Sequence, residues 1–439
     1  MDTYGRLDPM TPAPTTIQPS ATNWAGNLRY AARGVAAPRD LDELRRLLAD
    51  AELAGERVRP LGTRHSFNDI ADTDGLLVST AALPADIEID AERRLVRVSG
   101  GLRYGDLAVR LEESGWAVGN LASLPHISVA GAVSTGTHGS GDRNGSLAAS
   151  VAAVELLTAA GELVTLRRGD ADFDAVVVGL GAFGVVTYVT LDIEPSFQVE
   201  QTVYERLPLD AVLADLDAVT GLGYSVSLFT TWRDADVVDQ LWLKRRPDRD
   251  RPVPAEVVGA RPATGPRHPL PGVSAEHCTE QGGVAGPWLE RLPHFRMGFT
   301  PSNGEELQSE YLVPREHAVA AIEAVRGLAA DIAPLLFVSE MRTVAADTLW
   351  LSPAFGRDVV GLHFTWRPVQ AEVLALLPRV EAAVAEFEAR PHWGKLFATD
   401  AATLAPLYPR FDTFTALAAQ YDPNGRFLNA FTERVLSGA

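Results

Sequence analysis

The chain has one cysteine, no long apolar run and no recognisable export signal. Cys278 is the only cysteine among 439 residues, so an internal disulfide is impossible and nothing requires an oxidising compartment. No stretch approaches the roughly eighteen apolar residues of a membrane helix. The first twenty residues show neither a basic segment followed by an apolar one nor a twin arginine. We therefore expect a cytoplasmic protein without a membrane partner.

Basic residues are also scarce relative to acidic ones. There are 39 Lys and Arg against 57 Asp and Glu, which gives a formal net charge of -18 at pH 7. A surface that binds phosphates would have to overcome this negative field, so we expect no nucleic-acid partner. Apolar residues make up 46% of the chain, which is enough to bury the cores of the two domains expected for this length.

Hydrophobic periodicity divides the chain near residue 195. Residues 1–20 have the composition of a disordered tail. Residues 21–195 alternate short strands with amphipathic helices, the first of which begins at a capping pair, Asp40 and Glu43. Residues 196–397 combine strands of mixed polarity with long amphipathic helices, interrupted by an irregular excursion over residues 244–287. The pattern predicts an α+β fold.

Two glycine-containing loops carry the first functional signal. Residues 61–69 read LGTRHSFND directly after a short apolar segment, and residues 131–141 read GAVSTGTHGSG, preceded by SLPHISVA. Loops at strand ends hold ligands in α/β architectures, because the strand fixes the loop while glycine lets backbone amides approach an anion. Taken alone, the first loop is more consistent with an ordinary surface turn. No packing argument explains the glycines and hydroxyls of the second.

Together the two loops resemble the FAD-binding (PCMH-type) segments of the vanillyl-alcohol oxidase family of flavoproteins. Within that family the chain is most similar to the alditol oxidases, through ATNWAGNLRY, SVSLFTTWR, GPWLERLPHF, MRTVAAD, HFTW and RPHWGK. The resemblance runs from about residue 20 to the end. It implies a two-domain flavoprotein. Residues 21–195 would form an FAD-binding domain of two small α+β subdomains, to which residues 398–439 return. Residues 196–397 would form a cap domain built on a large antiparallel sheet flanked by helices.

The resemblance also implies how FAD is held. In the family a histidine of the first loop often bonds covalently to the flavin, and His65 matches it. The family usually reads GSGHS where this chain has GTRHS, so Arg64 stands where glycine, which adopts positive φ freely, is common. The further positions that the resemblance assigns to the cofactor are Gly62, Thr63, Arg64, Ser66, Ser123, Ser128, Gly131, Gly136, Thr137, His138, Gly139, Gly184 and Val186.

Polar residues at two-residue spacing carry the second signal. In FVSEMRTV the period places Glu340 and Arg342 on one strand face, and HFTW does the same for His363 and Thr365. Such alternation alone fits the solvated face of an antiparallel sheet. The resemblance instead implies that these four residues, with Lys395 and Ser123, line the substrate cavity. We expect no metal, and we assign no catalytic role to His126, His138, His294 or His392.

This set of residues suits the oxidation of a polyol. The alcohol loses a hydride to the flavin N5 and a proton from oxygen, so Arg342 and Lys395 would stabilise an alkoxide, and Lys395 or His363 would accept the proton. Glu340, Thr365 and Ser123 would bind further hydroxyls. The resemblance implies oxidation of the terminal primary alcohol of alditols such as xylitol and sorbitol, with O2 giving H2O2, in a monomer. A sugar-lactone (gulono- or galactono-1,4-lactone) oxidase or dehydrogenase and a flavin-binding protein without turnover are the alternatives.

Overall fold

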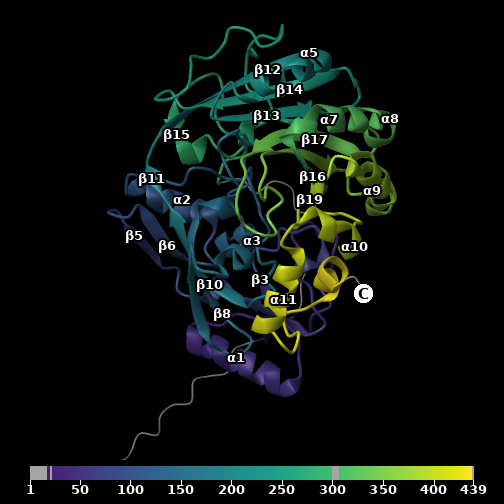
Figure 1. The fold of residues 1–439 in the computed structure, drawn as a ribbon. Coiled ribbons are helices and arrows are strands. Elements are labelled where there is room, and N and C mark those ends of the chain that lie inside the picture. Colours follow the sequence, from purple (N-terminus) through teal and green to yellow (C-terminus); the bar gives the residue numbers. More distant parts are fainter. Residues whose placement is uncertain (1–16, 20–21, 299–305, 438–439) are drawn as a thin grey trace, which may run out of the picture.

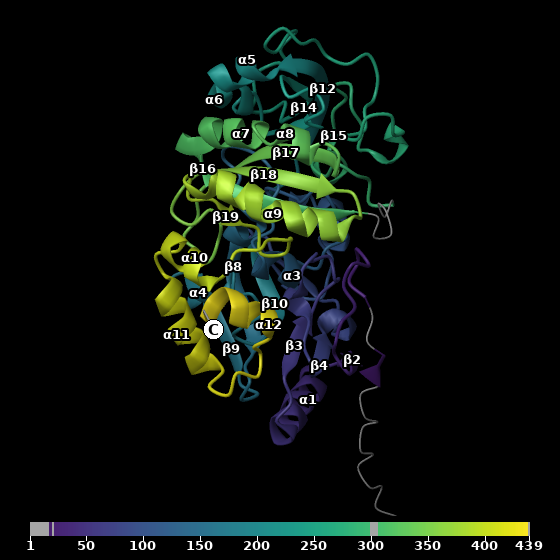
Figure 2. The same ribbon diagram turned by 90° about the vertical axis from the view of Figure 1, so that its right-hand side faces the viewer.

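The computed structural model describes residues 17–19, 22–298 and 306–437 (Figures 1 and 2). Its strands are β1 Ile17–Gln18, β2 Gly34–Ala36, β3 Val58–Leu61, β4 Leu76–Ser79, β5 Ile87–Asp90, β6 Leu95–Ser99, β7 Trp116–Ala117, β8 Val151–Leu157, β9 Leu163–Arg167, β10 Val185–Asp192, β11 Glu194–Pro195, β12 Gln198–Pro208, β13 Ser225–Thr230, β14 Val237–Arg245, β15 Gly286–Pro287, β16 Leu307–Pro314, β17 Leu336–Val344, β18 Val359–Trp366 and β19 Arg390–Pro391. Its α-helices are α1 Leu41–Ala54, α2 Tyr104–Glu113, α3 Val129–Ser134, α4 Phe173–Val176, α5 Leu209–Ala214, α6 Leu216–Thr220, α7 Ala318–Arg326, α8 Ala329–Ile332, α9 Gln370–Ala385, α10 Ala401–Leu404, α11 Phe411–Tyr421 and α12 Ala430–Thr432.

The described residues up to 195, here called the N-terminal module, contain two larger sheets and a two-stranded sheet of β7 and β11. One has the order β1-β2-β4-β3, with β2, β4 and β3 parallel and α1 crossing between β2 and β3. Helix α1 begins as predicted, since the Asp40 carboxylate accepts a hydrogen bond from the Glu43 N–H, and it ends at Gly55 in the left-handed conformation. The second sheet is antiparallel, with the order β5-β6-β10-β8-β9.

The predicted disordered tail extends too far toward the C-terminus. Ile17–Gln18 forms strand β1 and pairs with residues 35–36 of β2, because Gly34 lets the two backbones come close. A Cβ at Gly34 would lie within 3 Å of the Gln18 carbonyl oxygen. Residues 1–16 and 20 lie outside the described residues.

The second half of the chain forms an eight-stranded antiparallel sheet, here called the cap sheet. Its order is β15-β12-β14-β13-β17-β18-β16-β19, and it lies above the N-terminal module in Figure 1. Helices α7 and α9 pack together on one face, where the Tyr311 hydroxyl donates to the Glu381 carboxylate of α9. Side chains alternate along β16, so Glu310 points to the opposite face, toward the N-terminal module. The predicted α+β class with a large antiparallel sheet flanked by helices is confirmed.

The end of the chain leaves the cap sheet and returns to the N-terminal module. The yellow helices α10 and α11 lie in the lower half of Figure 1, below the sheet. The Val58 N–H of β3 donates to the Arg426 carbonyl, and the Asn429 amide donates to the carbonyls of Asp69, Ile70 and Asp72 just beyond the His65 loop. The C-terminal segment therefore braces the loop that carries His65. None of the described helices combines the length and apolar character that crossing a membrane requires.

Candidate active site

A cavity of about 460 Å³ lies between the N-terminal module and the cap sheet. One end is lined by the two glycine-containing loops and the other by strands β16, β17 and β18. The irregular excursion of the cap contributes His268, Pro269, Leu270 and Val273 to its wall. The cavity thus joins the two groups of residues that the sequence singled out separately.

The His65 loop follows β3 directly and is held in a defined conformation. Arg64 has φ of 64°, so it adopts the left-handed conformation that glycine, common here in the family, adopts at less cost. Its carbonyl accepts a 2.7 Å hydrogen bond from the Trp24 N–H, and the Trp24 ring stacks on His65 with 5.2 Å between ring centroids. Burial lowers the pKa of His65 to about 4, so its imidazole is neutral at pH 7.

Thr63 ties this loop to the second one. Its hydroxyl oxygen accepts a hydrogen bond of 3.1 Å from the Ser128 N–H and lies 3.1 Å from Nδ1 of His65. A Cβ at Gly62 or Gly131 would come within 3 Å of the Ser128 hydroxyl, so a side chain at either position would displace that hydroxyl. The threonine found in place of the family's usual serine therefore keeps the hydroxyl that joins the loops.

Most of the residues predicted to contact the cofactor reach this cavity. Gly136 and Gly139 are the exceptions, because neither lines the cavity. Gly136 forms a turn beside Pro353, and the open side of Gly139 is covered by the Asn120 side chain and the Leu121 carbonyl. Those that do line the cavity are Gly62, Thr63, Arg64, His65, Ser66, Ser123, Ser128, Gly131, Thr137, His138, Gly184 and Val186.

The predicted substrate residues lie together at the cap end of the cavity. Glu340, Arg342, His363 and Thr365 are each less than 9% exposed, which excludes the solvated sheet face. Ser123 joins them from the N-terminal module, with its hydroxyl 3.4 Å from Nη1 of Arg342. The structure brings all six predicted residues to one cavity wall.

Glu310 of β16 is the centre of this wall, and it was not predicted. Its Oε1 lies 2.9 Å from Nη2 of Arg342, and its Oε2 lies 2.5 Å from Nζ of Lys395. Burial alone would raise its pKa, but the charges of Lys395 and Arg342 outweigh burial and hold it well below the usual range. Glu310, Glu340, Arg342 and Lys395, here called the charged cluster, thus balance two positive against two negative charges.

Lys395 joins the charged cluster to His363. Its Nζ lies 2.8 Å from Nδ1 of His363, whose Nε2 lies 3.0 Å from the Thr365 hydroxyl. Burial, and next the charge of Lys395, lowers the pKa of His363 to about 4. The neutral imidazole therefore accepts from Lys395 and donates to Thr365, which leaves neither ring nitrogen directed at a substrate. Burial also lowers the pKa of Lys395, against the opposing charge of Glu310.

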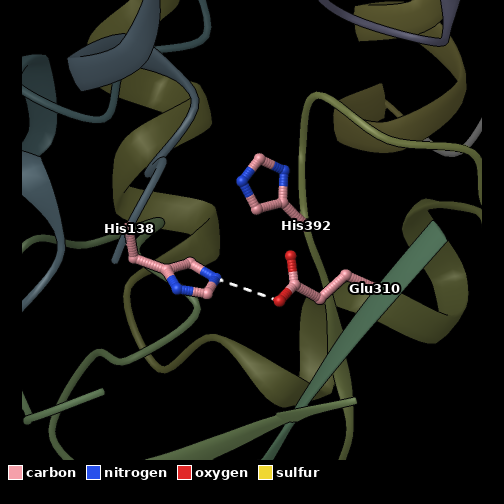
Figure 3. A group of neighbouring side chains, drawn as sticks. All are labelled: His138, Glu310 and His392. Carbon is pink, nitrogen blue, oxygen red and sulfur yellow. Dashed lines mark ion pairs between the residues drawn. The ribbon is translucent and has the colours of Figure 1, made fainter. Parts of the chain in front are cut away.

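Two further buried histidines flank Glu310, as Figure 3 shows. Nδ1 of His138 donates to the Gly139 carbonyl, so its Nε2 faces Glu310 at 3.3 Å, while Nδ1 of His392 accepts from the Gly394 N–H. Ligand atoms of His138, Glu310 and His392 lie within 4.8 Å of one another, a spacing that could hold a metal ion. Lys395 and Arg342 already neutralise Glu310. Their positive charges, in direct contact with the Glu310 carboxylate, would repel a divalent cation bound to it. His126 lies apart and contacts the Met297 carbonyl.

Two kinds of residue complete this wall beyond the predicted set: one kind shows strand periodicity and the other shows none. Gln308 and Glu310 show the same two-residue spacing in LQSEYLV as Glu340 and Arg342 in FVSEMRTV. The register then places His363 opposite both Glu310 and Glu340, so the three form a row across β16, β18 and β17. His294 had no periodic signal, because it lies on an irregular segment that only the tertiary structure brings to Glu340.

Sequence comparisons show which known proteins the chain is similar to. Residues 32–167 match the model of a FAD binding domain, and residues 301–435 match that of D-arabinono-1,4-lactone oxidase. The alditol oxidase of a Streptomyces species is 51% identical over 95% of this chain and 99% of its own length. The L-gulono-1,4-lactone dehydrogenase of Mycobacterium tuberculosis is 31% identical over 96% of this chain and all of its own.

Among solved structures, cholesterol oxidase from B. sterolicum has the same fold. Its TM-score is 0.79 over 98% of this chain and 99% of that chain, at 15% sequence identity. At this identity the likeness concerns the fold alone. A solvent-stable cholesterol oxidase gives a TM-score of 0.76 at 16% identity.

Proposed function

The chain belongs to the vanillyl-alcohol oxidase family of FAD-dependent flavoproteins, and we propose that it oxidises alditols such as xylitol and sorbitol at a terminal primary alcohol. The products would be the aldose and, with dioxygen as electron acceptor, hydrogen peroxide. The relative named alditol oxidase, at 51% identity, supports the substrate class. The observation that carries the proposal is the charged cluster, four ionisable groups on one wall of the cavity, of which Glu310, Glu340 and Arg342 are buried and Lys395 is 12% exposed.

The cavity fits FAD by the chemistry of its lining. Gly62, Thr63 and Ser66 after the end of β3, with Ser128 and Gly131 at the start of α3, present small and hydroxyl-bearing groups, which suits a pyrophosphate. The cavity is also lined by apolar residues that suit a flavin ring; they are Leu61, Ile127, Ala130, Ala132 and Val186. When bound, the isoalloxazine supplies the acceptor for the hydride.

His65 is the residue we propose for covalent attachment of FAD. Its neutral imidazole, stacked on Trp24 and held through Thr63, lies on the cavity wall in a nucleophilic state. Acid precipitation of the purified protein should leave the yellow colour in the pellet, and His65→Ala should release any flavin into the supernatant. Colour released entirely from the wild type would contradict the attachment.

The charged cluster can perform the remaining chemistry. Lys395 has two hydrogen-bond partners among the described residues, Glu310 and His363, which leaves one position on Nζ for a substrate hydroxyl. We propose that Lys395 accepts the proton of the substrate hydroxyl and that Arg342 stabilises the resulting alkoxide. Glu340, Thr365 and Ser123 would bind the neighbouring hydroxyls, and a site built for hydroxyls rejects analogues that lack them.

Product analysis under air tests this function. With xylitol or sorbitol we expect equal amounts of aldose and hydrogen peroxide, and much slower turnover with gulono- or galactono-1,4-lactone. The 31% identical lactone dehydrogenase makes the lactones the necessary comparison. Turnover of a lactone with no turnover of either alditol would replace the proposed substrate class, and an absolute need for an artificial acceptor would exclude dioxygen.

A further inference from the structure

Lysine is almost absent from this chain. It occurs only at positions 244 and 395, while every other member of the 39 basic residues is arginine. Lys395 belongs to the charged cluster, and Lys244 lies in β14 with 1% of its surface exposed. Neither ammonium group is therefore exposed: Lys244 is buried within the cap sheet, and Lys395, with a side chain 12% exposed, lies on the loop that follows β19.

The ammonium of Lys244 is matched to three acceptors. Its Nζ lies 2.5 Å from the Leu292 carbonyl, 3.3 Å from the Pro293 carbonyl and 3.1 Å from Nδ1 of His294. An ammonium has three hydrogens and no acceptor, so all three are used. Carboxylates lie farther than 4 Å from this Nζ within the described part of the chain. The planar fork of arginine could not donate to three acceptors around one point.

This arrangement fixes the tautomer of His294. Because Nδ1 accepts a hydrogen bond from Lys244, the neutral ring carries its hydrogen on Nε2, which lies 2.9 Å from Oε1 of Glu340. The ring is packed edge-on against Phe229 and Trp242, and burial lowers the pKa of His294 to about 4. The His294 N–H also donates to the carbonyl of Ser123, so the same residue joins two substrate-binding groups.

We propose that Lys244 and His294 are positioning residues that hold the Glu340 carboxylate in its substrate-binding orientation. Lys244 fixes the His294 tautomer, and His294 then donates to Oε1 while Oε2 lies 3.6 Å from Nε of Arg342. With the other tautomer, a bare nitrogen would face the carboxylate and repel it. This inference rests on the proposed function only for the identity of the substrate.

The energetics of Glu340 agree with this role. The carboxylate is 4% exposed, and burial alone would raise its pKa. Arg342 and His294 reverse this effect and keep its pKa below the ordinary value. Burial lowers the pKa of Lys244 to about 7 against the charge of Glu340, so the ammonium form that makes all three donations prevails below that pH. The ammonium, the imidazole and the carboxylate therefore form one coupled chain that ends at the cavity.

Steady-state and rapid-mixing kinetics with xylitol test the proposal. Lys244→Met should raise KM about tenfold, since hydrogen bonds to charged groups are worth roughly that factor, and should leave flavin reduction at saturation within about threefold. His294→Gln keeps an amide N–H for Glu340 and should stay close to the wild type. His294→Phe keeps the ring packing without the donor and should match Lys244→Met.

The double variant distinguishes positioning from a structural role. Glutamine has no tautomer to fix, so Lys244→Met should change KM less than about twofold in the His294→Gln background. A tenfold rise in both backgrounds, or an unchanged KM in His294→Phe at full flavin content, would overturn the proposal.

A readout without turnover keeps this inference separate from the proposed function. Nitrogen-15 NMR of labelled histidines should show His294 with its proton on Nε2 in the wild type and a mixture of tautomers in Lys244→Met. Lysine labelling adds a control, because the chain gives only two lysine side-chain signals. The signal that disappears in Lys244→Met is that of Lys244. An unchanged His294 tautomer in Lys244→Met would overturn the inference, whereas failure of alditols to reduce the flavin would overturn only the proposed substrate.

Discussion

Glu310 sets the electrostatics of the cavity wall, because one carboxylate pairs with both Lys395 and Arg342. Replacing it by glutamine leaves two buried cations without their shared counter-ion. Breaking a buried pair of this kind costs about 3–5 kcal/mol of unfolding free energy, which chemical denaturation of the flavin-loaded protein would measure. Glu88→Gln is the matched control, because its ion pair with Arg97 is exposed and should contribute below about 1 kcal/mol. Equal losses in both variants would contradict this account of Glu310.

The pH dependence of flavin reduction distinguishes Lys395 from His363 as the proton acceptor. A base must be unprotonated, so the rate should rise with pH and level off above the pKa of the acceptor. Burial lowers the pKa of Lys395, so its plateau should begin below pH ~10.4, the ordinary lysine value. If His363 were the acceptor, the rise would lie near its pKa of about 4.

Two variants check this assignment. Lys395→Arg keeps the positive charge but cannot release a proton. Its rate of flavin reduction should therefore be much lower than that of the wild type and should no longer rise with pH. Lys395→Met should lose it as well. A rise near pH 4 that survives in Lys395→Met would transfer the role to His363.

At the scale of the elements, the loop after β3 depends on the left-handed conformation of Arg64. Glycine adopts this conformation freely, so Arg64→Gly should change stability by less than about 1 kcal/mol. A β-branched residue is strained there, and Arg64→Val should cost about 1–2 kcal/mol more in denaturation experiments. Arg93, an exposed turn residue outside the positive-φ set, provides the control, since Arg93→Val should not show this penalty. Equal costs at both positions would show that the conformation is not what matters at Arg64.

Strand periodicity explains how much of the site the sequence could predict. The spacing of Glu340 with Arg342 and of His363 with Thr365 is local, and the structure places both pairs on the buried face. Whether such a face is buried depends on what covers it, which alternation alone does not reveal. Glu310 shows the same spacing, but its pairing with Lys395 depends on the register of β16 with β18 and on a loop 85 residues away. His294 lies outside any strand, so no local pattern indicated it.

At the scale of the whole molecule, the cavity exists because the cap sheet covers the two loops of the N-terminal module. The α+β class and the antiparallel cap sheet follow from helix and strand periodicity together with the family resemblance. Contacts that close the structure, such as Asn429 with the carbonyls beyond the His65 loop, join residues about 360 positions apart. No local pattern encodes such pairs. Gly136 and Gly139 show the converse, because they lie in a glycine-rich motif yet face other parts of the protein.

Anaerobic stopped-flow mixing with xylitol tests the central claim most directly, because it observes the chemical step before oxygen takes part. We expect the bound flavin of the wild type to be reduced fully, at a rate that saturates with xylitol. Lys395→Met and Arg342→Met should lower that saturated rate by about 10²-fold or more, since each removes a group that acts on the developing alkoxide. Flavin that stays oxidised with xylitol and sorbitol but is reduced by L-gulono-1,4-lactone would contradict the proposed substrate. Reduction at the wild-type rate in both variants would contradict the roles of the charged cluster.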